Sequence, residues 1–186
     1  MAKLIYATPT SLDGYIADET GSPDWAAPDE EGFAFINDLV RPIGVYLYGR
    51  KMYETMAIWE TPDVIPGRTP AMFDFARIWQ AADKIVYSKS LDTVSTSKTR
   101  LEREFDPHAV RELKAQLPHD ISVGGPTLAA HAIRTALVDE YHLFVVPMMI
   151  GGGTRVLPSN VSIKLDLLDE RRFANGMVYL RYQVQV

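Results

Sequence analysis

The sequence predicts an α/β domain, with a largely parallel β-sheet and helices packed on its faces. Short apolar runs that are typical of buried strands alternate with segments in which apolar residues recur at helical spacing. The last ten residues instead alternate strictly between two kinds of side chain, which predicts an antiparallel, half-buried strand. The chain has 186 residues, of which 47% are hydrophobic, so we expect one domain with a single core over residues 1–186.

Three strands and two helices are predicted in the first half of the chain. The apolar runs at 3–8, 45–48 and 84–88 are bounded by Pro, Gly, Arg or Asp, and each predicts a buried strand. The helices between these strands are marked by apolar residues at helical spacing: Phe33, Ile36 and Val40, then Met72, Phe75, Ala76 and Trp79. The stretch 61–70 carries Pro and Gly and is predicted to be a surface loop.

Two helices and three strands are predicted in the second half. Asp106-Pro107 predicts a helix start, because Asp caps well and Pro fits the first helical position. The run 121–123 predicts a strand that passes through a glycine turn into a helix ending near Val138. The apolar run 143–150 predicts a central strand, in which Pro147 needs a bulge or a position without a ladder bond. The apolar side of the strand that we expect to close the sheet is formed by Val178, Leu180, Tyr182, Val184 and Val186.

The composition argues against several classes of protein. A net charge of -5 without a concentrated basic block disfavours nucleic acid or an anionic membrane as partner, because phosphate groups attract clustered cations. The absence of cysteine excludes disulfides, thiolate nucleophiles and thiolate metal sites. The four histidines lack the spacing of metal ligands, so no metal is expected. No apolar segment has the length of a signal-peptide core or a membrane span, and we expect a cytoplasmic protein.

Two glycine turns suggest a nucleotide site. Gly49-Arg50-Lys51 follows one predicted strand, and Gly124-Gly125-Pro126-Thr127 follows another. Glycine lets a ligand approach the backbone closely, and the start of the following helix offers unpaired N–H groups to a phosphate. Glycine is also common in any strand-to-helix turn, so the pattern alone does not decide the function. Neither the Rossmann motif nor the P-loop motif is present at these turns.

Five blocks of residues carry more specific information. They are Ser11-Leu12-Asp13-Gly14-Tyr15-Ile16-Ala17, Asp24-Trp25, Tyr48-Gly49-Arg50-Lys51-Met52-Tyr53-Glu54, Val86-Tyr87-Ser88-Lys89-Ser90-Leu91, and Val123-Gly124-Gly125-Pro126-Thr127-Leu128 continued through Leu137-Val138-Asp139-Glu140-Tyr141 to Pro147 and Gly151-Gly152-Gly153. In this order they resemble the dihydrofolate reductase-like family. The chain is most similar to the branch related to the reductase half of the bifunctional riboflavin-biosynthesis deaminase/reductase. Because it has neither the length nor the cysteines of the deaminase half, we expect a stand-alone reductase-like domain.

The resemblance implies an eight-stranded mixed sheet, flanked by helices, that binds NADPH across its C-terminal strand edges. It assigns the cofactor's phosphate region to the first glycine turn, at Gly49, Arg50, Lys51 and Met52. It assigns the pyrophosphate and the nicotinamide side to the second, at Gly124, Gly125, Pro126, Thr127 and Leu128. The 2′-phosphate falls to Ser88, Lys89 and Ser90, where two hydroxyls and a cation suit a dianion and no carboxylate interrupts the turn. Without the resemblance, this trio is equally well read as a solvated turn.

The proton donor is less well defined than the cofactor site. In the family, one carboxylate on the first helix, shortly after a Trp, binds the substrate, and Glu30 or Asp29 after Trp25 matches that position. Acidic residues in a first helical turn also simply complement the helix dipole. Asp13 is the second candidate, in a Leu-Asp-Gly turn that faces the expected site, although Asp is common in such turns for conformational reasons.

These observations favour an NADPH-dependent reductase of a small heterocycle, of the dihydropterin or ribosylaminopyrimidine class. The alternative is a protein that keeps the reductase fold and binds NADPH without catalysis. A hydrolase is disfavoured because no G-x-S-x-G nucleophile motif is present. We also expect a homodimer, since the strand at 143–150 and the C-terminal strand supply more sheet surface than one small domain covers.

Overall fold

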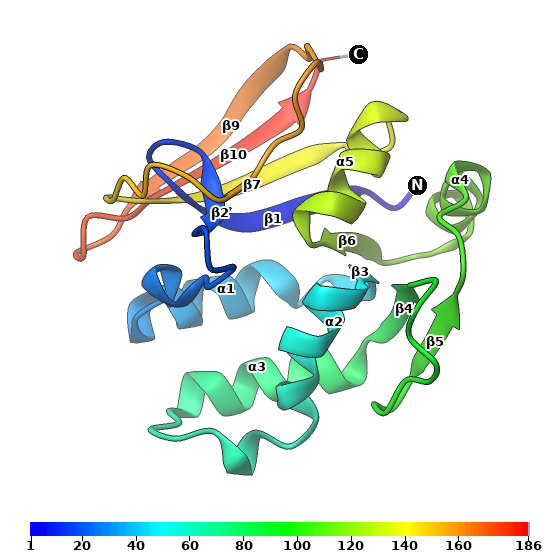
Figure 1. Cartoon of the computed structure of the whole chain (residues 1–186), viewed down its shortest axis with the longest axis horizontal. Coiled ribbons are helices and arrows are strands. Elements are labelled where there is room, and N and C mark those ends of the chain that lie inside the picture. Colours follow the sequence, from blue (N-terminus) through cyan, green and yellow to red (C-terminus); the bar gives the residue numbers. More distant parts are fainter. Residues whose placement is uncertain (186) are drawn as a thin grey trace.

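The computed structural model describes residues 1–185 and contains one eight-stranded mixed sheet (Figure 1). Along the sheet, the strands are β5 (Thr99–Glu102), β4 (Asp83–Tyr87), β3 (Ile43–Gly49), β6 (Asp120–Gly124), β1 (Leu4–Ser11), β7 (Glu140–Val146), β10 (Val178–Val184) and β9 (Leu165–Arg172). The first six are parallel, and β10 is antiparallel to both its neighbours. A separate antiparallel pair is formed by β2 (Tyr15–Ala17) and β8 (Thr154–Arg155). The predicted α/β class, mostly parallel with an antiparallel C-terminal strand, is confirmed.

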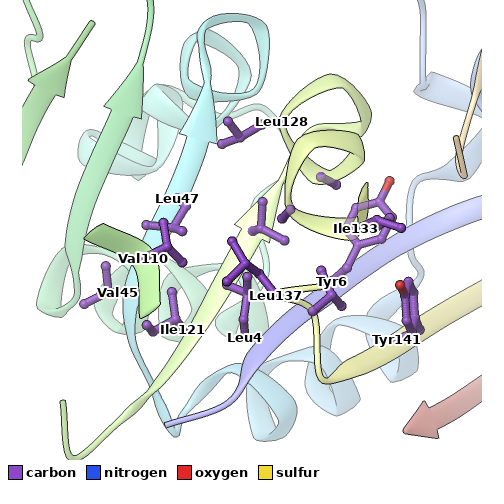
Figure 2. Close-up of a cluster of buried hydrophobic side chains, with 14 of the residues drawn as sticks. Leu4, Tyr6, Val45, Leu47, Val110, Ile121, Leu128, Ile133, Leu137 and Tyr141 are labelled. Carbon is purple, nitrogen blue, oxygen red and sulfur yellow. The ribbon is translucent and has the colours of Figure 1, made fainter. Parts of the chain in front are cut away.

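Helices cover both faces of the sheet, as predicted. On one face, α4 (Pro107–Gln116) and α5 (Pro126–Arg134) pack on alternate strand residues such as Leu4, Leu47 and Ile121, which Figure 2 shows with their neighbours. On the other face lie α1 (Glu30–Val40), α3 (Pro70–Ala81) and the short α2 (Arg50–Met56). Three 3-10 turns complete the chain: η1 (Asp24–Ala26), η2 (Ala57–Glu60) and η3 (Pro62–Val64). No helix among residues 1–185 is long and apolar enough to cross a membrane.

The helix start predicted at Asp106 is confirmed by its capping bond, and α1 begins with a similar cap at Asp29. The carboxylate of Asp106 accepts a hydrogen bond from the N–H of His108, with Pro107 at the first helical position of α4. The carboxylate of Asp29 accepts from the N–H of Gly32 at the start of α1. Such caps satisfy N–H groups that have no partner inside the helix.

The limits of two strands, β1 and β7, differ from the prediction by three residues or more. β1 does not end at Thr8 but continues through Pro9 to Ser11. Its pairing with β6 ends at Tyr6, so at Pro9 the strand has a neighbour only on the β7 side and one side needs no ladder bond. β7 begins three residues before the predicted 143–150 run, at Glu140, and ends at Val146. The chain therefore leaves the sheet just before Pro147, which cannot donate a ladder bond.

The sheet also extends beyond the predicted closing strand. β10 lies inside the sheet, and the edge is formed by β9, which pairs with β10 alone. The sequence of β9, Leu-Asp-Leu-Leu-Asp-Glu-Arg-Arg, lacks the alternation that would have identified it, and all eight residues are exposed. β5, at the opposite edge, was missed because it is only four residues long. Val186, which we assigned to the final strand, lies outside the described residues.

Candidate cofactor-binding site

The three predicted cofactor segments lie side by side at one edge of the sheet. β4, β3 and β6 are adjacent and parallel, so their C-terminal ends meet. Gly49 is in register with Tyr87, and Tyr48 is in register with Gly124. The segments 49–52, 88–90 and 124–128, which follow these three strands, are therefore neighbours although they are far apart in the sequence.

Direct contacts join these segments. The guanidinium of Arg50 donates a hydrogen bond of 3.0 Å to the hydroxyl of Ser90. Arg50 also forms an exposed ion pair with Glu54 one turn further along α2. A side chain built on Gly49 would come within 3.7 Å of Cβ of Leu128, so the first and second glycine turns are also in contact range.

The second turn has a backbone that requires glycine. Gly125 has φ of +92°, which L side chains rarely adopt, and a Cβ there would lie 3.2 Å from Cβ of Met52. A Cβ on Gly124 would lie only 2.7 Å from the ring of Tyr48, which is buried on the α3 face. Gly124 is thus required by the packing of Tyr48 and Met52 against the turn, and Gly125 is required by its backbone conformation and by Met52. Glycine at the residue before α5 also leaves no side chain of its own between the backbone and a ligand.

The start of α5 adds an electrostatic contribution at the same place. Gly125 is the residue before the helix and supplies no side-chain cap, while Pro126 has no N–H to donate. The first intrahelical bond from this turn is donated by Ala129 to the carbonyl of Gly125. The N–H groups of Thr127 and Leu128 therefore belong to the first turn, whose donors have no acceptor within a helix. A phosphate is the natural partner of such donors, because the helix N-terminus carries a partial positive charge.

The Ser88 turn is organised by its own hydrogen bonds. The hydroxyl of Ser88 is buried and accepts from the N–H groups of Ser90 and Leu91. The guanidinium of Arg103 donates to the carbonyls of Ser88 and Leu91, at 3.2 Å and 2.6 Å. Arg103 thus brings a cation to the turn that our sequence analysis missed, because its position in the run Glu102-Arg103-Glu104 resembles an ordinary solvated segment.

A carboxylate that the sequence of the Ser88 turn lacks reaches it from another segment. Lys89 Nζ lies 3.5 Å from a carboxylate oxygen of Glu104, which follows β5 and reaches the turn from the edge of the sheet. Both side chains are 79% exposed, so the pair contributes little and leaves Lys89 free to exchange partners. This contact was invisible in the sequence because β5 itself was not predicted.

Asp13 lies at the same edge, beyond the end of β1. Its carboxylate accepts from the hydroxyl of Ser11 at 2.6 Å and from the N–H groups of Gly151 and Ile150 at 2.8 Å and 3.2 Å. The hydrogen bond from Ser11 is the main cause that lowers the pKa of Asp13, and the backbone donors add to it. Asp13 is therefore ionised at neutral pH and ties the turn after β1 to the glycine-rich segment after β7. A catalytic role for it stays a prediction.

The structure separates the two carboxylates after Trp25. Asp29 caps α1 and also accepts a hydrogen bond from the side chain of Asn175. Glu30 is the first residue of α1 and its side chain is exposed, which leaves it free to act on a ligand. The indole Nε1 of Trp25 is buried and has no hydrogen-bond partner among the described residues. A buried donor without a partner is a candidate for contact with a substrate.

The other two tryptophans belong to the core on the α3 face. Trp79 is fully buried and donates a hydrogen bond to the hydroxyl of Tyr48. Trp59 packs edge-on against Phe33 and Phe75.

Comparison with known proteins identifies the family. The model of the RibD C-terminal domain family matches residues 2–179, which is nearly the whole chain. The chain belongs to the RibD C-terminal domain family. Among curated relatives of this RibD C-terminal domain are two uncharacterised proteins of Bacillus subtilis (strain 168). YyaP is 25% identical to this chain, and the alignment covers 97% of this chain and 94% of YyaP. YwjB is 27% identical, and the alignment covers 81% of this chain and 80% of YwjB.

Solved structures show the same fold. A protein of Shewanella sp. PV-4, whose name assigns it provisionally to riboflavin biosynthesis, matches with a TM-score of 0.76, 18% identity and complete coverage of both chains. A pyrimidine reductase-like protein of Corynebacterium diphtheriae matches with a TM-score of 0.69 and 15% identity, over 100% of this chain and 92% of that one. The Thermotoga maritima deaminase/5-amino-6-(5-phosphoribosylamino)uracil reductase matches with a TM-score of 0.68 and 15% identity, over 99% of this chain. This RibD C-terminal domain spans 57% of the Thermotoga protein, and it is reductase-like at the level of its family.

Proposed function

We propose that this protein is an NADPH-dependent reductase of a small heterocyclic substrate, of the dihydropterin or ribosylaminopyrimidine class. The observation that carries the proposal is the meeting of three segments from distant parts of the chain at one sheet edge. Two of them are glycine turns that start helices, and the third is the cation-bearing Ser88 turn. The reductase-like family supports the same reaction class.

The residues of this edge fit a phosphorylated dinucleotide. Gly125 places no side chain at the turn, and the start of α5 offers N–H donors for a pyrophosphate. Arg50, Lys89 and Ser90 stand at the neighbouring turn, where a 2′-phosphate would find two cations and a hydroxyl. Met52 packs against the glycine turn and would shape its wall.

The chemistry of the site follows from what each residue can do. When bound, the nicotinamide supplies a hydride to an unsaturated C=N or C=O bond of the substrate. Asp13 is ionised, so it accepts hydrogen bonds and positions the loop of Gly151 rather than donating a proton at neutral pH. Trp25 Nε1 offers a donor that orients a substrate acceptor. Glu30 is exposed and is the carboxyl free to contact the substrate and an ordered water that carries the proton.

Turnover is the direct test of the proposal. NADPH oxidation is measured with dihydrofolate, other pteridines, and pyrimidine ribosides with and without a 5′-phosphate. We expect one of these classes to be reduced. Glu30→Gln should then lower kcat without weakening NADPH binding, because a proton donor acts on the chemical step. Asp13→Asn keeps one acceptor oxygen for the loop and should lower kcat less. Unchanged kcat in both variants, at acid and neutral pH, would remove both carboxylates from the mechanism.

A second function is a nucleotide-binding protein without catalysis. It is favoured by the positions of the acidic residues, since Asp13 and Asp29 are both used in structural hydrogen bonds and Glu30 points to open solvent. Such a protein would bind NADPH with the same residues but oxidise it with none of the substrates. The substrate screen together with a binding measurement separates the two.

A further inference from the structure

The side chain of Arg103 is anchored to the Ser88 turn, residues 88–91, through one nitrogen of its guanidinium. Nη1 of Arg103 donates hydrogen bonds to the carbonyls of Ser88 and Leu91, at 3.2 Å and 2.6 Å. The sheet brings Arg103 there, because β4 and β5 are parallel neighbours (Figure 1) with Tyr87 in register with Glu102. The N–H of Ser88 also donates to the carbonyl of Glu102. Arg103 therefore follows β5 at the point where the turn follows β4.

The rest of this guanidinium is free to bind a ligand. A guanidinium has five N–H donors, and Nε and Nη2 of Arg103 donate to no residue in the described part of the chain. The N–H of Nε and one N–H of Nη2 form a planar fork, which matches two oxygens of a phosphate group. Because the bonds to the two carbonyls already restrict the side chain, less conformational freedom is lost when the fork binds an anion.

The charge of Arg103 is not neutralised by a carboxylate. The other cations near the turn share one property, an ion pair with an acidic side chain: Lys89 with Glu104, Arg50 with Glu54, and Arg100 with Glu102. Arg103 forms no such pair within residues 1–185. An anion that binds Lys89 or Arg50 competes with a carboxylate of the protein, whereas an anion that binds Arg103 does not.

We propose that Arg103 recognises the 2′-phosphate of NADPH and that Arg103, rather than Lys89, is the main determinant of the preference over NADH. The inference rests on the proposed function, because it assumes that an adenine dinucleotide binds at the C-terminal ends of β3, β4 and β6. NADH carries a neutral hydroxyl at the same place. A single uncharged oxygen cannot fill the fork, so Arg103 distinguishes the two cofactors by both charge and shape.

Cofactor affinities of an Arg103→Lys variant test the proposal. Lysine keeps the positive charge and can donate to the two carbonyls, but its ammonium group has no planar fork. By isothermal titration calorimetry, the Kd of NADPH should rise about tenfold or more, whereas the Kd of NADH should stay within about twofold. Lys89→Ala should reduce the preference for NADPH by less than Arg103→Lys does.

Arg100→Lys is the matched control, because Arg100 is an exposed arginine of β5 that is already paired with Glu102. It should change the affinity for neither cofactor. An equal loss of affinity for NADPH and NADH in Arg103→Lys would show that Arg103 only holds the turn in place. A larger loss of preference in Lys89→Ala would assign the phosphate to Lys89. Either result overturns the proposal.

Two adenosine fragments separate this inference from the proposed reaction. Adenosine 2′,5′-bisphosphate carries the 2′-phosphate without a nicotinamide, and adenosine 5′-monophosphate lacks it. The unmodified protein should bind the bisphosphate about tenfold more tightly or better, and Arg103→Lys should bind the two fragments with similar affinity. If this pattern holds but no substrate oxidises NADPH, the reductase function fails and the role of Arg103 stands. If a substrate is reduced and Arg103→Lys changes kcat/KM with neither NADPH nor NADH, the reductase function stands and the role of Arg103 fails.

Discussion

Gly125 meets two demands at once, a left-handed backbone and an open approach to the chain. Its φ of +92° strains any L residue, and the neighbouring Met52 limits the space for a Cβ. A Cβ there would meet Met52, and the shift that relieves this contact would move the start of α5, whose N–H groups a phosphate would bind.

Gly125→Ala should therefore weaken NADPH binding at least tenfold. The backbone strain also lowers the free energy of unfolding, on the order of 1–3 kcal/mol. Gly67→Ala is the matched control, because Gly67 has φ of +64° with nothing within 4 Å and lies outside the predicted site. Isothermal titration calorimetry measures the NADPH affinity of the two variants. Equal NADPH affinity in the two variants would show that the glycine turn does not contact the cofactor.

Single residues were predictable from the sequence where the backbone conformation allows few residue types. The Gly-Gly-Pro order revealed the turn at Gly125 because few residues other than glycine adopt its conformation. The contacts of Asp13 with Gly151 and of Arg103 with Ser88 were not predictable, since each joins segments whose meeting depends on the strand order.

At the scale of elements, the start of α1 separates structural from functional carboxylates. Asp29 caps the helix and binds Asn175, whereas Glu30 has an exposed side chain. Asp29→Ala should lower the free energy of unfolding by about 1 kcal/mol, the usual cost of a lost cap. Glu30→Gln should leave it within about 0.5 kcal/mol, as for most surface substitutions. Urea denaturation measures both, and an equal loss would show that Glu30 too is structural.

Helices and buried strands followed from the sequence more closely than edge strands did. The caps at Asp29 and Asp106 and the apolar spacing of α3 are local signals, and the structure confirms them. All eight residues of β9 are exposed, so burial imposes no alternation on its sequence. The burial of β5 does alternate, but four residues are too few for a clear signal. The predicted start of β7 lay three residues too late, because Glu140 and His142 are polar residues inside the strand. A prediction from hydropathy alone leaves such residues out of a buried strand.

At the scale of the whole molecule, Glu140 ties three strands together. Its carboxylate accepts from Lys3 before β1, from His142 on β7 and twice from Arg181 on β10. Burial raises the pKa of Glu140, but the hydrogen bonds from Arg181, Lys3 and His142 outweigh it and bring the pKa to about 2. Because the folded pKa is depressed, this contribution to stability is complete above the unfolded value of 4.5 and is lost as the pH falls through about 2.

Glu140→Gln should lower the free energy of unfolding at pH 7 by about 1.5–3 kcal/mol, because the partly exposed Arg181 and Lys3 lose their charged acceptor. The difference from the unmodified protein should shrink as the pH is lowered from 4.5 towards 2. Glu31→Gln removes the exposed ion pair with Arg171 and should cost at most about 1 kcal/mol. Chemical denaturation across this pH range measures both. A difference that does not change with pH would contradict the ionic role of Glu140.

The expected preference for NADPH over NADH follows from the charges at the C-terminal ends of β3 and β4. The 2′-phosphate would replace the weak, exposed pairing of Lys89 with Glu104 and would add contacts with Arg50 and Ser90. Hydrogen bonds to charged groups contribute about 1.5–3 kcal/mol each. Displacing an exposed ion pair costs at most about 1 kcal/mol, so the net preference should be tenfold or more.

A thermal-shift titration with both cofactors tests the central claim most directly, since the tighter ligand raises Tm at the lower concentration. NADPH should raise Tm at a concentration at least tenfold below that needed with NADH. The Lys89→Ala variant should show a smaller difference between these two concentrations. Equal shifts with the two cofactors, a larger shift with NADH, or no shift with either would contradict the assignment of this edge as an NADPH site.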